Sequence, residues 1–96
     1  MMVLITYDVE TTTSEGKKRL RKVSKECVNY GRRVQNSVFE CLLTEVQFYR
    51  LKSLLESIID KREDSIRFYL LGDNWNRRIE SIGKITTFAI DEELIV

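Results

Sequence analysis

The sequence predicts an α+β domain of the ferredoxin-like type, with the element order βαββαβ. Short segments rich in β-branched and aromatic residues alternate with segments whose apolar residues recur every three or four positions. Both helical segments open with the residue spacing of a capping box. This order completes an antiparallel sheet with two helices on one face by about Gly72, which leaves a further C-terminal segment to be explained.

The first strand is expected over residues 2–8, and it ends in a lone carboxylate, Asp8. Thr12 and Glu15 have the capping-box spacing, so a helix should begin there. Its buried stripe is expected to contain Leu20, Val23, Cys27 and Val28. Gly31 should end this helix as a left-handed cap, because glycine adopts a positive φ without steric cost.

The residue pattern in the middle of the chain predicts a hairpin and a second helix. Residues 32–35 and 38–43 are too rich in β-branched residues for a helix, and a tight turn or bulge is expected between them. Thr44 and Gln47 repeat the capping-box spacing, and the helix that follows has an apolar face made of Phe48, Leu51, Leu55 and Ile58. Residues 65–71 alternate in character and predict the fourth strand.

The chain continues for 24 residues after the expected ferredoxin-like fold is complete. Residues 1–72 are expected to form the ferredoxin-like core, and residues 73–96 a connector followed by one or two strands, at about 78–83 and 85–96. A finished βαββαβ sheet has an open face and unpaired edges, which strands from a second copy would cover. The sequence therefore predicts a single domain that forms a homodimer by packing its C-terminal strands on the partner subunit.

The composition of the chain excludes several kinds of catalytic site and of segment. The 96-residue chain is 43% hydrophobic and 32% charged, typical of a globular domain. It contains no histidine, which excludes Ser-His-Asp triads, imidazole bases and most zinc sites. The longest apolar runs have about five residues, so neither a secretory signal nor a membrane span is expected, and the cytoplasm is the expected compartment. Cys27 and Cys41 are expected to be buried, reduced thiols.

Positive charge is concentrated in the first half of the chain. Residues 1–43 hold eight Lys/Arg against five Asp/Glu, whereas residues 44–96 hold eight against ten. Six of these cations lie within residues 17–25. A charged helix face is often only a solvated surface, but this local excess favours binding to a phosphate backbone, with affinity that depends strongly on salt.

Asp8 lies where the first strand leaves the sheet, a common position for reactive groups. Carboxylate oxygens are preferred ligands of Mg²⁺ or Mn²⁺, and a bound metal would activate water for phosphodiester hydrolysis. One carboxylate per chain is few for such a site, although two copies of Asp8 facing each other across a dimer axis would suffice. The alternative is that Asp8 only caps a turn.

Several segments together resemble one known family. They are "YDV" at the end of the first strand, "RLRKV" in the first helix, "YGRRVQNSVFEC" through the hairpin, "LKSLLESIID" in the second helix and "DSIRFYLLG" in the fourth strand. The chain is similar, over about residues 1–83, to the small CRISPR-associated endoribonuclease that accompanies the integrase in spacer acquisition. That family has a ferredoxin-like fold and forms homodimers in which the last strands cross onto the partner's sheet.

The resemblance implies a metal-dependent nuclease that acts on single-stranded RNA or double-stranded DNA, with Asp8 as the metal-binding catalytic residue. It also implies a complex with an integrase dimer, in which basic residues hold double-stranded DNA. By charge, the candidates for nucleic-acid binding are Lys17, Lys18, Arg19, Arg21, Lys22, Arg32, Arg33, Arg77 and Arg78. Tyr7, Ser37 and Phe39 are expected to shape the site.

Three functions follow from these expectations. The first is an adaptation protein with Mg²⁺-dependent endonuclease activity that joins the integrase in antiviral defence. The second is a double-stranded DNA-binding scaffold of the integration complex, for which Asp8 would be dispensable. The third is a toxin-type ribonuclease of the same fold. The sequence leaves RNA and DNA open as substrates, because a metal and backbone contacts recognise phosphate and not base.

Overall fold

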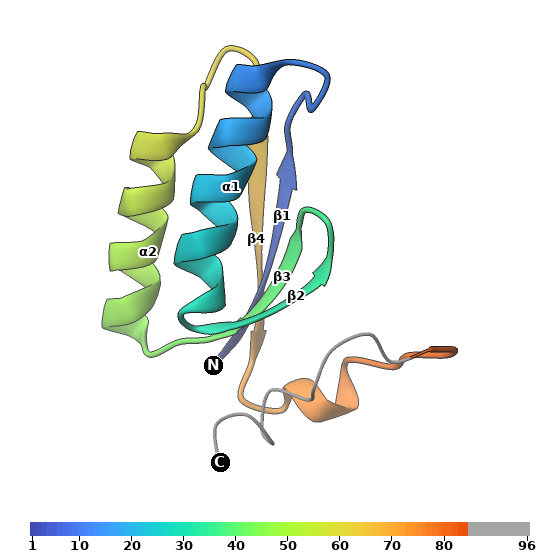
Figure 1. Cartoon of the computed structure of the whole chain (residues 1–96). Helices are drawn as coiled ribbons and strands as arrows, with labels where there is room; N and C mark the ends of the chain where they lie inside the picture. Colours follow the sequence, from blue (N-terminus) through green and yellow to red (C-terminus); the bar gives the residue numbers. More distant parts are fainter. Residues whose placement is uncertain (85–96) are drawn as a thin grey trace.

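The computed structural model describes residues 1–84, in which two helices cover one face of a four-stranded antiparallel sheet (Figure 1). The strands lie in the order β2-β3-β1-β4, so the predicted ferredoxin-like α+β fold is confirmed. The elements, in chain order, are β1 (Met2–Asp8), α1 (Ser14–Val28), β2 (Gly31–Gln35), β3 (Val38–Leu42), α2 (Glu45–Ile58), β4 (Ser65–Gly72) and a 3₁₀ turn, η1 (Trp75–Arg77).

The core lies between the sheet and the two helices. In the centre of the sheet Ile5 pairs with Phe39 on one side and Phe68 on the other, so their side chains share the helix-covered face. The apolar stripes of the helices cover this face and are buried at Leu20, Val23 and Cys27 of α1 and Phe48, Leu51 and Leu55 of α2. Burial of each large side chain contributes about 1.5–3 kcal/mol, and this packing sets the positions of β1 and α1.

The two helix starts agree with the sequence to different degrees. At α2 the capping box is confirmed, because Thr44 Oγ1 accepts from Gln47 N–H at 3.2 Å and Gln47 Oε1 accepts from Thr44 N–H at 2.9 Å. At α1 the predicted cap was wrong by one residue. Thr13 is the cap, and its hydroxyl accepts from Gly16 N–H at 3.0 Å.

The predicted role of Gly31 was also wrong. Helix α1 ends at Asn29 in an ordinary right-handed conformation, and Tyr30 N–H donates to Cys27 O at 3.0 Å. Gly31 instead begins β2, and a Cβ atom there would lie 1.8 Å from the carbonyl oxygen of Glu40. Glycine is therefore required by the close approach of the two strands and not by a positive φ.

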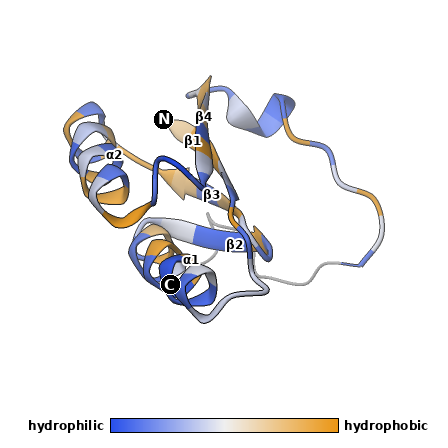
Figure 2. Ribbon diagram, turned by 90° about the horizontal axis from the view of Figure 1, so that it is seen from above, coloured by the Kyte–Doolittle hydropathy of each residue, from blue (hydrophilic) through white to orange (hydrophobic). Residues whose placement is uncertain are grey.

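The chain leaves the core after β4. Gly72, with φ of +76°, turns it into η1, and in the view from above the connector extends away from the helices (Figure 2). Residues 79–84 form no strand, and Ile82 is fully exposed. The strand at 78–83 was predicted to pair with a partner subunit, and residues 1–84 of one chain provide no neighbour for it, so that strand stays a prediction. The strand predicted at 85–96 lies outside the described residues.

The expectation for the two cysteines is confirmed. Cys27 and Cys41 are free, buried thiols, and Cys41 Sγ donates to the Cys27 carbonyl oxygen at 3.4 Å. Within residues 1–84, no helix is long and apolar enough to cross a membrane.

Candidate functional site

Asp8 is the last residue of β1, and its side chain is exposed at the rim of the sheet. It pairs with Ser65, the first residue of β4. On the other side of β1, Tyr7 N–H donates to Ser37 O at 2.9 Å, which holds the tip of the β2–β3 hairpin beside the strand end. In Figure 1 this rim lies at the same end of the molecule as the start of α1. Asp8 is therefore an accessible carboxylate on a supported strand end.

The loop that follows Asp8 is held against α1. A Cβ atom on Gly16 would lie 1.7 Å from the carbonyl oxygen of Glu10, so the loop packs against the helix only because this position is glycine. The Glu10 carboxylate accepts from Thr12 N–H at 3.1 Å, and this bond lowers the pKa of Glu10 below its usual value. Glu10 is thus an exposed carboxylate already used in the turn.

Beneath the rim lies a buried charge that the sequence did not predict. Asp64, between α2 and β4, has a side chain with no exposed area. Its carboxylate accepts from Arg19 Nε at 2.8 Å and Nη2 at 3.1 Å, from Asp60 N–H at 3.0 Å and from the Tyr7 hydroxyl. The Tyr7 hydroxyl, predicted to shape the site, therefore points into the interior, and its role at the site stays a prediction.

The pKa values follow from this arrangement. Burial raises the pKa of Asp64, but the hydrogen bonds from Arg19, Tyr7 and Asp60 outweigh it together and leave the pKa below its usual value. Burial, followed by the bond to Asp64, raises the pKa of Tyr7 well above that of a free phenol. The Asp64 carboxylate is thus charged, and the Tyr7 hydroxyl protonated, at neutral pH.

The predicted nucleic-acid-binding residues fall into three groups. The first, which we call the outer cations, lies exposed on α1 and comprises Lys17, Lys18, Arg21 and Lys22. Three of them line a shallow hollow together with Ser14 and Glu15, close to the helix start. Within the described residues, no salt bridge engages an outer cation. These side chains are available to phosphates.

The second group is engaged within the protein. Arg19 is bound to Asp64, so the structure favours an internal role over the predicted contact with nucleic acid. Arg32 pairs with the buried Glu40 at 3.1 Å. Arg33 donates to the Asn36 carbonyl at 2.7 Å and lies 5.8 Å from the centre of the Phe39 ring. Their binding to nucleic acid stays a prediction.

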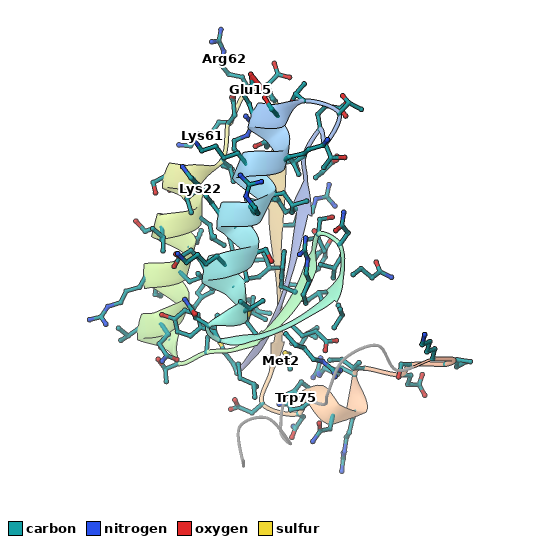
Figure 3. All side chains as sticks on the ribbon, in the orientation of Figure 1. Met2, Glu15, Lys22, Lys61, Arg62 and Trp75 are labelled. Carbon is teal, nitrogen blue, oxygen red and sulfur yellow. The ribbon has the colours of Figure 1, made fainter. Side chains whose placement is uncertain are left out.

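The third group is remote from the rim. Arg77 and Arg78 lie in and just after η1, at the end of the molecule opposite the start of α1 (Figure 1). Figure 3 shows Trp75 of the same turn next to Met2 at that end, whereas Glu15 lies at the other. The single chain therefore does not bring these two arginines to Asp8.

The remaining predicted residues lie in and next to the β2–β3 hairpin. Phe39 is fully buried in the core, where its ring lies beneath Arg33. The Ser37 carbonyl oxygen accepts from Tyr7 N–H and so holds the hairpin tip beside the end of β1. A role of either side chain in shaping the site stays a prediction.

A divalent cation fits this rim only in part. Asp8 has the oxygen chemistry that Mg²⁺ prefers. Among residues 1–84, however, no group of three or more His, Cys, Asp or Glu side chains could hold a metal ion. The described residues of one chain thus form no complete ligand set around Asp8, and further ligands would have to come from water, substrate phosphates or a second copy of the chain.

Comparison with known proteins identifies the family. Residues 1–79 match the family described as CRISPR associated protein Cas2. The chain belongs to the Cas2 family. It is 52% identical over 95 residues to a CRISPR-associated endonuclease Cas2 of Halalkalibacterium halodurans, with 99% of each chain covered. It is also 52% identical to a CRISPR-associated endoribonuclease Cas2 of Chlorobaculum tepidum, covering 86% of each chain.

A solved structure supports the same family assignment. The crystal structure of Streptococcus pyogenes Cas2 at pH 6.5 is 63% identical to the chain and has a TM-score of 0.81, covering 86% of this chain and all of that one. The prediction of a CRISPR-associated nuclease is therefore confirmed at the level of the family.

Proposed function

We propose that this Cas2 protein is a metal-dependent endonuclease of CRISPR spacer acquisition, with Asp8 as its metal-binding catalytic residue. The observation that carries the proposal is an exposed carboxylate on a supported strand end, at the same end of the molecule as the start of α1, whose four outer cations form no salt bridge within residues 1–84. Its substrates are phosphodiester bonds of single-stranded RNA, double-stranded DNA or both. The names of the relatives, endonuclease and endoribonuclease, support the same class of reaction.

The outer cations bind the substrate. The outer cations lie within the first nine residues of α1, and the helix N-terminus adds favourable interaction with anions bound near its first turn. Phosphates held there lie on the same end of the molecule as Asp8. This arrangement recognises the backbone and not the bases, so either kind of nucleic acid fits it.

Asp8 would hold Mg²⁺ or Mn²⁺, which supplies an activated water and stabilises negative charge on the phosphate. Because each chain contributes one carboxylate, the competent site takes an Asp8 from each subunit of a homodimer. The C-terminal residues beyond the core supply a means of joining two copies, and the sheet face without helices provides a surface for the partner. The dimer then joins the CRISPR integrase dimer in acquiring spacers.

Asp8→Asn tests this function, because it preserves the size of the side chain but removes the anionic ligand. In the presence of Mg²⁺, cleavage of labelled RNA and duplex DNA should fall by about two orders of magnitude or more. Dimerisation and duplex binding should not change. Mixed dimers with one Asn should lose more than half of the activity if the site is shared, and half if each chain works alone.

The second candidate is a non-catalytic scaffold that positions double-stranded DNA for the integrase. One observation favours it: within the described residues of a single chain, no group of three or more His, Cys, Asp or Glu side chains could hold a metal ion. In that case the Asn variant would cleave at the rate of the parent in Mg²⁺, or neither would cleave, while both would bind duplex DNA equally well.

A further inference from the structure

The buried carboxylate of Asp64 links three parts of the chain immediately beneath Asp8. Its donors come from β1 through the Tyr7 hydroxyl, from α1 through Arg19 and from the turn after α2 through Asp60 N–H. Asp64 N–H also donates to the Asp60 carbonyl at 2.7 Å, which closes the turn on itself. A single side chain thus joins elements that are more than fifty residues apart in the sequence.

A buried carboxylate is tolerated only when its oxygens are satisfied, because an unpaired charge inside a protein is very costly. Here both oxygens accept hydrogen bonds, and the two from Arg19 form a bidentate pair. No buried side-chain polar atom in residues 1–84 lacks a partner. Such a fully satisfied network has one low-energy arrangement, and it therefore fixes the direction of every side chain within it.

Asp8 itself makes no bond in this network, but the residues before and after it in the chain are held in place. Tyr7 is held by its hydroxyl on Asp64 and by its amide on Ser37 O. Val9 packs against the core, and the carbonyl of Glu10 lies against Gly16. Asp8 is thus an exposed residue between fixed ones, although exposed side chains at strand ends ordinarily sample several directions.

We propose that Asp64, acting through Tyr7 and Arg19, is a positioning residue for the nuclease reaction. It fixes the end of β1 so that the Asp8 carboxylate keeps a constant direction relative to the outer cations. This inference rests on the proposed function of Asp8 and adds the residues that orient it. Groups that orient a metal ligand typically affect metal affinity or activity by about 10–100-fold, which sets the effect to be measured.

Tyr7→Phe is the most direct test, because it removes only the hydroxyl and leaves the buried ring in place. With labelled single-stranded RNA and duplex DNA in Mg²⁺, kcat on the cleaved substrate should fall about tenfold while KM changes less than about twofold. Asp64→Asn should lower kcat further, because its amide would point a donor at Arg19 or Tyr7. Binding of either nucleic acid should stay at the level of the parent.

Amide hydrogen exchange of the metal-free protein gives a readout that does not depend on catalysis. In Tyr7→Phe, residues 8–13 should exchange faster while the centre of the sheet keeps the protection of the parent. Val3→Ala is the matched control, because it removes buried atoms from the same strand without touching the network. It should lower stability and increase exchange throughout the sheet, with kcat at the level of the parent under folding conditions.

The outcomes separate the inference from the function on which it rests. If Asp8→Asn abolishes cleavage while Tyr7→Phe retains the parent's kcat and exchange pattern, the positioning role is wrong and the nuclease site stands. If Asp8→Asn cleaves like the parent, the proposed site is wrong, and the positioning role falls with it. If Val3→Ala lowers kcat as much as Tyr7→Phe does, the network contributes only stability.

Discussion

The two sides of α1 carry the same kind of residue in different roles. On the inner side Arg19 is only 20% exposed and forms a bidentate pair with a buried carboxylate. On the outer side Lys17, Lys18, Arg21 and Lys22 are exposed, and no salt bridge engages them within the described residues. Five cations within six positions of sequence thus divide into one that holds the fold together and four that face the solvent.

The difference shows what decides the function of a charged side chain. An exposed cation interacts weakly with its surroundings in water and is free to bind phosphate. A cation paired with a buried carboxylate cannot leave without exposing an uncompensated charge. Arg19 is therefore expected to act on nucleic acid only indirectly, whereas the outer cations are expected to act directly. Three experiments test this division.

The largest effect is expected from reversing the outer cations. Changing Lys17, Lys18, Arg21 and Lys22 together to Glu should weaken duplex binding by about a thousandfold or more at low salt, because phosphate contacts are replaced by repulsion. For the parent, log K against log salt should have a slope of about −0.9 per neutralised phosphate, so four contacts give a slope between about −3 and −4. Fluorescence anisotropy at several salt concentrations measures both quantities.

A matched control changes the same number of charges elsewhere. Exposed cations of α2 and the turn that follows serve this purpose, namely Arg50, Lys52, Lys61 and Arg62. Their joint change to Glu should weaken binding far less than reversal of the outer cations does. Equal losses in the two variants would mean that net charge, and not the surface of α1, governs binding.

The next effect concerns the inner side of the helix. Asp64→Ala leaves Arg19 and the Tyr7 hydroxyl without their acceptor and should lower the free energy of unfolding by about 3 kcal/mol. Denaturant unfolding followed by circular dichroism measures the change. Lys18→Ala, on the outer side of the same helix, should leave the unfolding midpoint nearly unchanged.

A double variant distinguishes the loss of the ion pair from the loss of packing around Asp64. Replacing both partners with apolar residues of similar volume, Arg19→Met with Asp64→Leu, should recover much of the lost stability, because no buried charge is left unpaired. If the double variant is as unstable as Asp64→Ala, packing around the aspartate and not the ion pair would account for the loss.

The smallest effect is a dependence of stability on pH. The folded pKa of Asp64 lies below that of an unfolded aspartate, which is about 3.9. The carboxylate therefore contributes stability that is fully present above the unfolded value and is lost as the pH falls through the lower, folded one. Acid unfolding should be less steep in the Arg19→Met, Asp64→Leu double variant than in the parent. An identical acid profile would show that other carboxylates control the transition.

Much of the fold was predictable from local patterns. The β-branched and aromatic residues of β1, the alternation of residues in β4 and the apolar stripes of the helices predicted the type of these elements, since burial on one face imposes a period of two or about 3.6. The capping box of α2 was found from two residues three positions apart. At α1 the same pattern misled, because three consecutive threonines offer alternative caps and only the packing of Gly16 against Glu10 selects Thr13.

The candidate site was predictable only in part. Asp8 was found because a carboxylate at the end of an apolar strand is conspicuous, and the outer cations because charge is visible in composition. Asp64 was missed because it lies among four charged residues, Lys61 to Asp64, in what resembles an ordinary solvated turn. The nearest signal was the "DSIRFYLLG" segment, in which this aspartate directly precedes the fourth strand.

The sequence by itself determined the order of elements, the buried faces and the local excess of positive charge, since each depends on residues close together in the chain. The tertiary structure alone decided which cations are free. Arg19 and Arg21 have the same side chain two positions apart, but Arg19 turns toward a partner 45 residues away and Arg21 faces the solvent. Pairings across such a distance depend on how helices and strands pack together, and a pattern of neighbouring residues does not contain that information.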